Sequence, residues 1–273
     1  MAFLSGFLKD IKDGWTSFKN RNQIIELSFS RVQAYSRCPL MYNLVYNRGW
    51  RSGPNGSMAL GLSLHRALAA YFSEENKSRT LDQLNDIYDH VWVNEGYKNT
   101  QELLDTYDGG RKMLGRFFER DQKRTTEVVA TEKEFGMNME GLHFRGTVDR
   151  IDRCPDGSFE VIEYKTHGDC WSESRIANDL QMTFYALGVK EGLHLQPLKL
   201  KYMFLSSGET VETHRTAEQT TAARELLYDI ARRLRRKEFD PNNEYCIRCE
   251  FGTRCQKSGG TAPAGAAPAS RRT

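Results

Sequence analysis

The chain has 273 residues, 39% of them hydrophobic, and a formal net charge of +3. That content suffices for one large domain, or one domain with an appended lobe. The near-neutral charge gives no global argument for nucleic-acid binding. No run of 18 apolar residues occurs, which excludes a membrane span, and the N-terminus lacks the pattern of a secretory signal. A cytoplasmic protein with reduced thiols is therefore expected.

Residues 1–25 look like a leader without recognisable chemistry, and residues 26–257 like the ordered domain. Helices are predicted at 28–37, with Ser28 or Ser30 as the cap, at 41–46 and at 59–71. Residues 81–122 carry two further helices, and the glycines of Asp108-Gly109-Gly110 predict the break between them.

Strands dominate residues 128–166, with Glu140-Gly141 as a turn. A helix at 174–190, a strand at 198–205 and a helix at 217–237 follow. This order predicts an α/β fold with a mixed central β-sheet flanked by helices. From residue 258 onward Gly, Ala, Pro, Ser and Arg prevail, which predicts a disordered tail.

Two strands of this region form a hairpin that carries paired acids. Gly146-Thr147-Val148-Asp149 lies before the turn Pro155-Asp156-Gly157, and Glu163-Tyr164-Lys165 lies after it. A three-residue loop with Gly157 in the left-handed conformation pairs Cys154 with Ser158. That register places Asp149 opposite Glu163, with Lys165 on the same face. A two-residue loop would instead place Tyr164 opposite Asp149 and Pro155 inside the ladder, so it is disfavoured.

Two opposed carboxylates repel each other unless a cation lies between them. Mg²⁺ binds one or two carboxylates together with water and substrate phosphate. With an amine nearby to act on a water, Asp149, Glu163 and Lys165 predict metal-dependent hydrolysis. The alternative is an ordinary surface hairpin in which Lys165 pairs with an acid.

Three further residues fit the same site. Gln181 and Tyr185 are four residues apart, so they share one face of the helix that follows the hairpin. His65 lies on an earlier helix, and a neutral imidazole suits Mn²⁺ or another borderline metal. Each also has a structural alternative, since a packed Tyr with a surface Gln and a lone His are common features of ordinary proteins.

The four motifs together resemble the RecB-type nucleases of the PD-(D/E)xK superfamily. They are Gly-x-x-x-His at 61–65, Gly-x-x-Asp at 146–149, Glu-x-Lys at 163–165 and Gln-x-x-x-Tyr at 181–185. Their order and rough spacing match across residues 28–256. The resemblance implies a restriction-endonuclease-like core.

The resemblance also implies roles for the motif residues. His65, Asp149 and Glu163 would be ligands of Mg²⁺ or Mn²⁺, with the Tyr164 carbonyl as a further possible ligand. Asp149, Glu163 and Lys165 would be the catalytic residues, with Lys165 positioning or activating the attacking water. The other pair, Gln181 and Tyr185, would orient DNA near the scissile phosphate.

Four cysteines occur in a one-plus-three arrangement. Cys38 lies near the start of the domain, and Cys246, Cys249 and Cys255 close it. Four thiolates suit a [4Fe–4S] cluster or a tetrahedral zinc. Zinc sites more often show two tight pairs, so the spacing favours iron–sulfur. The arrangement resembles the staple of RecB-like and CRISPR-adaptation nucleases, which implies a structural N- plus C-terminal Fe–S lobe.

The expected function is therefore a metal-dependent DNA exonuclease. Single-stranded DNA is the substrate that the resemblance favours, in repair, recombination or CRISPR adaptation. The chain has no G-x-x-x-x-G-K-[ST] loop, so any unwinding would come from a helicase or another recombination or adaptation partner. The alternatives are a non-catalytic Fe–S DNA-binding or assembly subunit and a structure-specific endonuclease. Cys154 and Cys170 have no assigned role.

Overall fold

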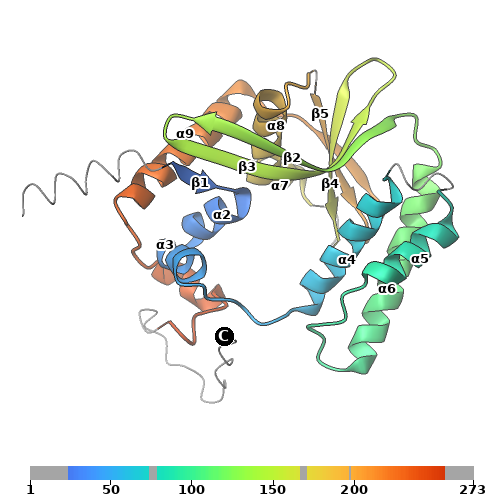
Figure 1. Ribbon diagram of the computed structural model, residues 1–273, viewed down its shortest axis with the longest axis horizontal. Coiled ribbons are helices and arrows are strands. Elements are labelled where there is room, and N and C mark those ends of the chain that lie inside the picture. The colour runs from blue at the N-terminus through green and yellow to red at the C-terminus, as the bar shows by residue number, and fades with distance from the viewer. Residues whose placement is uncertain (1–23, 74–78, 167–170, 197, 256–273) are drawn as a thin grey trace, which may run out of the picture. The chain divides into compact units, whose positions relative to one another are not determined.

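The computed structural model describes residues 24–73, 79–166, 171–196 and 198–255 (Figure 1). The predicted tail, most of the predicted leader, and Cys170 lie outside these described residues. Within them the chain divides into two compact units. The first unit combines residues 24–51, 136–145 and 221–255, and the second combines 52–135 with 146–220.

The second unit contains a mixed sheet, as predicted. Its strands are β2 (Glu127–Met139), β3 (Leu142–Arg153), β4 (Phe159–Lys165), β5 (Leu198–Phe204) and β6 (Thr210–Thr213), of which residues 136–139 and 142–145 are assigned to the first unit. β3 pairs antiparallel with both β2 and β4, the latter pairs parallel with β5, and β5 pairs antiparallel with β6. The turn between β2 and β3 contains Gly141, as predicted, whereas β6 was not predicted.

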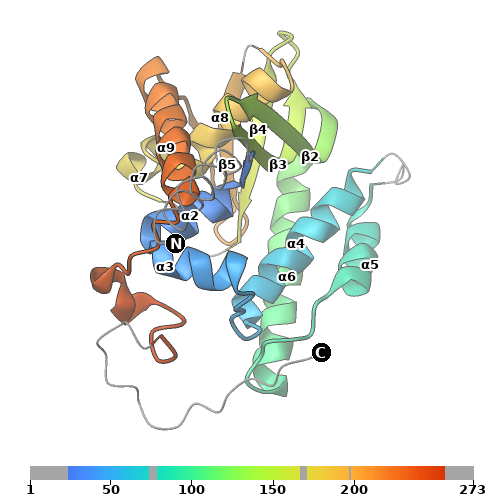
Figure 2. The same ribbon diagram turned by 60° about the vertical axis from the view of Figure 1, so that its left-hand side comes forward.

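Helices lie on both faces of this sheet. α4 (Gly56–Tyr71), α5 (Leu81–Val91) and α6 (Thr100–Asp121) pack against one another on one face (Figure 2). Their buried side chains form one cluster with Ile162 and Tyr164 of β4. Each such apolar side chain contributes about 1.5–3 kcal/mol when fully buried. α7 (Glu173–Ala177) and α8 (Leu180–Gly192) lie between β4 and β5 in the chain, and α8 contacts both strands.

Two predicted helix boundaries are wrong. Asp108-Gly109-Gly110 lies inside α6, and the break falls instead between α5 and α6. Gly110 packs under Tyr88, whose hydroxyl would lie 2.0 Å from an added Cβ, so the glycine serves close packing rather than a turn. The predicted helix at 174–190 is divided into α7 and α8 because Asp179 caps α8 by accepting the Met182 N–H at 2.9 Å.

The first unit holds the two ends of the ordered region together. Its elements are β1 (Ile25–Leu27), α2 (Phe29–Arg37), α3 (Pro39–Tyr42), a π-turn (Asn43–Asn47), α9 (Ala217–Arg235) and a 3₁₀ turn (Asn243–Arg248). β1 pairs parallel with the start of β3. Ser28 caps α2, as predicted, by accepting the Arg31 N–H at 3.4 Å. The Tyr35 hydroxyl donates to the Glu238 carbonyl at 2.6 Å and ties α2 to the segment after α9.

The predicted hairpin register is confirmed. Arg150 pairs with Ile162 and Arg153 with Phe159, which is the ladder that opposes Asp149 to Glu163. The Cys154 N–H donates to the Ser158 carbonyl at 2.8 Å, and Gly157 has φ +82°. The turn chemistry therefore fixes which side chains reach each face of the sheet.

Gly146 is required by packing. A Cβ at Gly146 would lie 2.5 Å from the ring of Phe135, and this ring also covers Gly188, where an added Cβ would lie 2.0 Å away. Phe135 is buried, and its ring lies against both glycines. Gly146→Ala should therefore destabilise the fold by about 1–3 kcal/mol, measured by urea denaturation.

Gly115→Ala is the matched control for this prediction. Gly115 lies within α6, and an added Cβ there meets nothing within 4 Å. Because alanine favours helix over glycine, this variant should gain about 0.5–1 kcal/mol. Equal stability of the two variants would contradict the packing argument.

Candidate active site

The three predicted catalytic residues lie together in the second unit. Asp149 and Glu163 are 7% and 4% exposed, so two carboxylates are buried on neighbouring strands. The ammonium of Lys165 lies 2.7 Å from Glu163 Oε1. The Tyr164 N–H donates to Asp149 Oδ2 at 2.8 Å, which fixes the Asp149 carboxylate against β4. The predicted grouping of these residues on the hairpin is therefore present.

Gln181 and Tyr185 of α8 complete a hydrogen-bond network around the lysine. Lys165 donates to Gln181 Oε1 at 2.9 Å, and Gln181 Nε2 donates to Glu163 Oε1 at 2.8 Å and to the Tyr185 hydroxyl at 2.9 Å. Gln181 contacts Lys165 and Glu163 directly, and Tyr185 is linked to them through Gln181. Their predicted role in orienting DNA stays a prediction, since the contacts present position Lys165 and Glu163.

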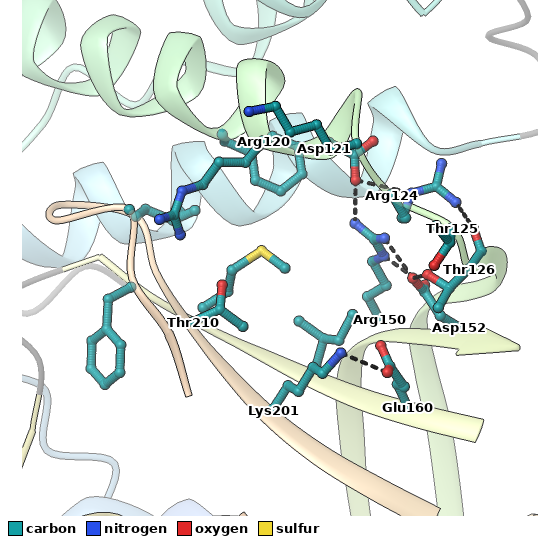
Figure 3. Close-up of a pocket in the computed structure, with 17 residues that line it drawn as sticks. Arg120, Asp121, Arg124, Thr125, Thr126, Arg150, Asp152, Glu160, Lys201 and Thr210 are labelled. Carbon is teal, nitrogen blue, oxygen red and sulfur yellow. Dashed lines mark hydrogen bonds and ion pairs between the residues drawn. The ribbon is translucent and has the colours of Figure 1, made fainter. Parts of the chain in front are cut away.

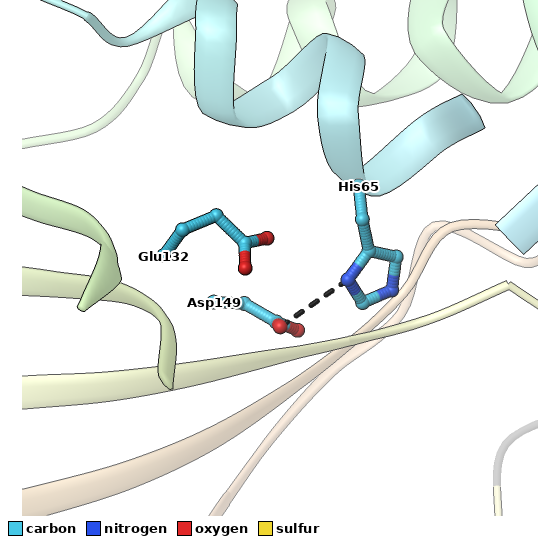
Figure 4. A group of neighbouring side chains, drawn as sticks. All are labelled: His65, Glu132 and Asp149. Atoms are coloured by element: carbon cyan, nitrogen blue, oxygen red, sulfur yellow. Dashed lines mark ion pairs between the residues drawn. The ribbon is translucent and has the colours of Figure 1, made fainter. Parts of the chain in front are cut away.

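His65 and a residue that the sequence did not reveal form a second group around Asp149. His65 Nδ1 lies 3.2 Å from Asp149 Oδ1. Glu132 of β2 reaches the same place, and the ligand atoms of His65, Glu132 and Asp149 all lie within 4.8 Å of one another (Figure 4). No motif pointed to Glu132, which lies in a strand with two other acids, Glu127 and Glu134.

The backbone of Glu132 is unusual. Its φ is +44°, in the left-handed region that side chains other than glycine rarely adopt. Such conformations cost on the order of 1–3 kcal/mol and cluster at functional sites. The strained backbone within β2 accompanies a side chain that joins the His65–Asp149 group.

The electrostatics of the site show acids held at close quarters. Burial, and then the charge of Asp149, raises the pKa of Glu163 above its usual range. Glu132 is exposed, but partial burial of its carboxylate, and then the charge of Asp149, raise its pKa. Burial opposes the charged form of His65, but the hydrogen bond and charge of Asp149 outweigh it and raise the pKa of His65 to about 9. In the metal-free protein at neutral pH, a protonated His65 therefore partly compensates the acids.

The donor set fits a divalent cation. Glu163 Oε2 is buried and has no hydrogen-bond partner among the described residues, and an unpartnered buried carboxylate oxygen is costly. The charges of Asp149 and His65 act on Glu163, but the group within 4.8 Å consists of His65, Glu132 and Asp149 and does not include Glu163. Imidazole and carboxylates are ligand types of Mg²⁺ and Mn²⁺. Because a metal-binding imidazole must be neutral, a cation at this site would displace the proton of His65.

The strained backbone allows a separate test of Glu132. Glu132→Gly and Glu132→Gln should both weaken Mn²⁺ binding on the order of tenfold or more, because each removes a carboxylate. Only the glycine relieves the left-handed conformation, so Glu132→Gly should be about 1 kcal/mol more stable than Glu132→Gln. Calorimetric Mn²⁺ titration and urea denaturation measure the two effects. Wild-type Mn²⁺ affinity in both variants would contradict a ligand role.

The opposite face of the same hairpin has a structural network instead. A cavity of about 490 Å³ is lined by Arg150, Asp152, Glu160 and Lys201 among others (Figure 3). Arg150 is fully buried and donates to both oxygens of Asp152 at 2.6 Å. Lys201 pairs with Glu160 Oε1 at 2.6 Å. The charges of these four residues are paired, and the cavity contains none of the predicted catalytic residues.

The four predicted cluster ligands meet in the first unit. Cys38, Cys246, Cys249 and Cys255 all line one cavity, together with apolar side chains such as Leu44. Burial raises the pKa of the Cys249 thiol, and the other three thiols raise it further. The Asn242 N–H points to Cys38 Sγ at 3.3 Å. Four thiols in a partly apolar cavity, with a backbone donor aimed at sulfur, fit a thiolate-bound cofactor. Cys154 is buried elsewhere, beside the hairpin turn.

Comparison with known proteins places the chain in a family. Residues 26–256 match the PD-(D/E)XK nuclease superfamily. The chain belongs to this superfamily of nucleases.

One solved structure shares the fold. The crystal structure of a "putative exonuclease" from Eubacterium rectale is 13% identical, with a TM-score of 0.52, and the match covers 93% of each chain. The crystal structure of SSO0001 is 19% identical and covers 73% of this chain and 85% of its own, but its TM-score of 0.36 supports no argument. No protein of curated function matches the chain.

No helix in the described part is long and apolar enough to cross a membrane.

Proposed function

We propose that the chain is a RecB-like, divalent-metal-dependent exonuclease that hydrolyses single-stranded DNA. The observation that carries this proposal is the buried pair of Asp149 and Glu163, with Lys165 bound to Glu163 and with Glu163 Oε2 left without a partner. A scaffold has no need of two buried acids that repel each other. Membership of the nuclease superfamily supports hydrolysis of phosphodiester bonds.

His65, Asp149 and Glu163 would hold Mg²⁺ or Mn²⁺, with Glu132 as a further ligand and the Tyr164 carbonyl as another candidate. When bound, the cation supplies Lewis-acid chemistry, which lowers the pKa of a water and neutralises charge on the phosphate. The backbone hydrogen bond from Tyr164 to Asp149 holds that carboxylate in place before binding. Such pre-organisation reduces the cost of assembling the site.

Lys165 would orient the attacking water and stabilise the negative charge that develops on the phosphate. Gln181 holds both the lysine and Glu163, so the ammonium remains beside the acids rather than in solvent. Tyr185 in turn holds Gln181, and burial raises the pKa of Tyr185, so its hydroxyl stays protonated. If Gln181 and Tyr185 contact DNA as predicted, they would do so through donors and acceptors that their hydrogen bonds within the protein do not occupy.

The four cysteines would hold a [4Fe–4S] cluster. Their convergence on one cavity supports a shared cofactor, and the one-plus-three spacing favours iron–sulfur over zinc. The cluster would join Cys38 to the end of the ordered region and close a loop of about two hundred residues. Because such a closure restricts the unfolded chain, the role is structural. Residues 26–257 would thus form one nuclease domain with its Fe–S lobe.

The setting would be repair, recombination or CRISPR adaptation, with a helicase or adaptation partner supplying any unwinding. The test compares linear and circular single-stranded DNA, and linear duplex, with anaerobically purified protein in Mn²⁺ or in EDTA. Degradation of linear single strands in Mn²⁺ alone is expected. Cutting of the circles would indicate an endonuclease instead. Binding of DNA without cleavage by folded, metal-loaded protein would overturn the enzyme proposal in favour of a non-catalytic assembly subunit.

A further inference from the structure

An aromatic side chain lies directly beside the lysine of the site. The ammonium of Lys165 is 5.1 Å from the centre of the Trp171 ring. Trp171 packs against two rings of β5, with centroids 5.5 Å from Tyr202 and 5.9 Å from Phe204. In the β4–β5 ladder, Tyr202 pairs with Glu163 and Phe204 pairs with Lys165. The indole is therefore part of the wall beside Lys165.

A second cation lies on that indole. The guanidinium carbon of Arg175 is 3.6 Å from the centre of the Trp171 ring, which is a close cation–π contact. The backbone of Arg175 is fixed as well, because its N–H donates to Ser172, the cap of α7. The Arg175 side chain is exposed, and no ion pair with a carboxylate is found for it within the described part of the chain. A stacked guanidinium keeps N–H donors free at its edge.

We propose that Trp171 and Arg175 form a binding site for a backbone phosphate of the substrate strand, close to the phosphate that is cleaved. This inference rests on the proposed function, because the cleaved phosphate is placed by Lys165. The Lys165 ammonium is 5.1 Å and the Arg175 guanidinium carbon 3.6 Å from the centre of the same Trp171 ring. The two cationic groups are therefore no further apart than the sum of these distances. At about 3.4 Å of rise per nucleotide along a strand, this separation corresponds to a few nucleotides.

The contacts favour a phosphate over a base as the bound group. A base would need an open face of the indole, but Arg175 covers one face and the rings of Tyr202 and Phe204 pack against Trp171. The donor that remains is the N–H edge of the guanidinium, which matches two phosphate oxygens. Because the ring already holds the guanidinium, less side-chain entropy is lost on binding. The site therefore recognises the backbone and carries no sequence preference of its own.

The test is the salt dependence of single-stranded DNA binding, measured by fluorescence anisotropy of a labelled oligonucleotide in Ca²⁺. Arg175→Ala should reduce the slope of log affinity against log salt by about one, as for the loss of one phosphate contact. In cleavage assays with Mn²⁺, the same variant should raise KM with kcat nearly unchanged, because it removes binding that is equal in the ground and transition states. Arg175→Lys, which keeps the charge but not the planar fork, should fall between Arg175→Ala and wild type.

Lys190→Ala is the matched control. Lys190 is an exposed cation in the last turn of α8, more than about 10 Å further along the helix from Gln181. Its loss should leave the salt slope unchanged. A wild-type slope in Arg175→Ala, in protein with the wild-type melting temperature, would overturn the inference.

The two proposals fail in distinguishable ways. If the wild-type protein cleaves DNA and Arg175→Ala binds DNA as wild type does, only the phosphate site is wrong. If Arg175→Ala lowers the salt slope but no preparation cleaves DNA, the phosphate site stands and the nuclease proposal falls. If the wild-type protein does not bind single-stranded DNA at all, both are wrong.

Discussion

Lys165→Ala should lower kcat for DNA cleavage on the order of 10²–10³-fold while Mn²⁺ binding is kept. The loss is expected because the ammonium is the group placed to orient the water and to stabilise charge on the phosphate. Mn²⁺ affinity should be equal to or above that of wild type, because Lys165 competes for Glu163 Oε1, to which it lies 2.7 Å away. Single-turnover cleavage and calorimetric Mn²⁺ titration on the same preparation measure the two effects.

Lys201→Ala is the control for this prediction. Lys201 lies on the same sheet and makes an equally short pair, 2.6 Å from Glu160 Oε1, but on the opposite face. Its removal reproduces the loss of a lysine–glutamate pair without touching the proposed chemistry, so kcat should stay near that of wild type. Equal activities of the two variants would remove Lys165 from the mechanism.

Cys249→Ala should give a colourless protein with a melting temperature lower by about 10 °C or more. Loss of one of four ligands releases the cofactor, and the segment that contains Cys246 and Cys255 then loses its link to Cys38. In a domain of this size, a loss of several kcal/mol lowers the melting temperature by this amount. Iron and sulfide analysis, visible absorption and thermal unfolding measure the effect.

Cys154→Ala is the matched control, because Cys154 is also a free cysteine but is buried beside the hairpin turn. It should keep the wild-type iron content and colour. Retention of iron and of the melting temperature in Cys249→Ala would contradict the cluster. Four-thiolate zinc in place of iron in the wild-type protein would keep the site but correct its cofactor.

The hairpin that carries Asp149, Glu163 and Lys165 could be predicted from the sequence alone. The three-residue turn with Gly157 fixes the register, and the register alone places Asp149, Glu163 and Lys165 on one face. Gln181 shares that region because helical spacing and the order of elements place it at the start of α8. Local rules suffice here because the turn and the side-chain periods are set by neighbouring residues.

Glu132 could not be predicted by the same rules. Its side chain joins His65 and Asp149 from a residue at which the backbone of β2 adopts a left-handed conformation. Strand periodicity assumes regular backbone, so it gives no warning of such a position. The predicted helix break at Gly109-Gly110 was wrong for a related reason. Gly110 is needed for close contact with Tyr88 on another helix, and local sequence patterns contain no information about that contact.

The break between α7 and α8 is an intermediate case. Asp179 followed by an apolar helix is a recognisable cap, and its hydroxyl partner Tyr202, at 2.6 Å, shows that the same carboxylate also fixes β5. The cap signal was present in the sequence, but one continuous helix at 174–190 was predicted. The Asp179 cap divides it into α7 and α8.

The most direct test of the account is cleavage of end-labelled single-stranded DNA by wild-type protein and by Asp149→Asn. Asp149 is the residue shared by the Glu163–Lys165 pair and the His65–Glu132 group, so its loss should remove both Mn²⁺ binding and cleavage. The account predicts Mn²⁺-dependent shortening from a labelled end by the wild type, abolished by EDTA and absent in Asp149→Asn. Cleavage that persists in a folded Asp149→Asn protein would contradict the assignment of this site as the nuclease centre.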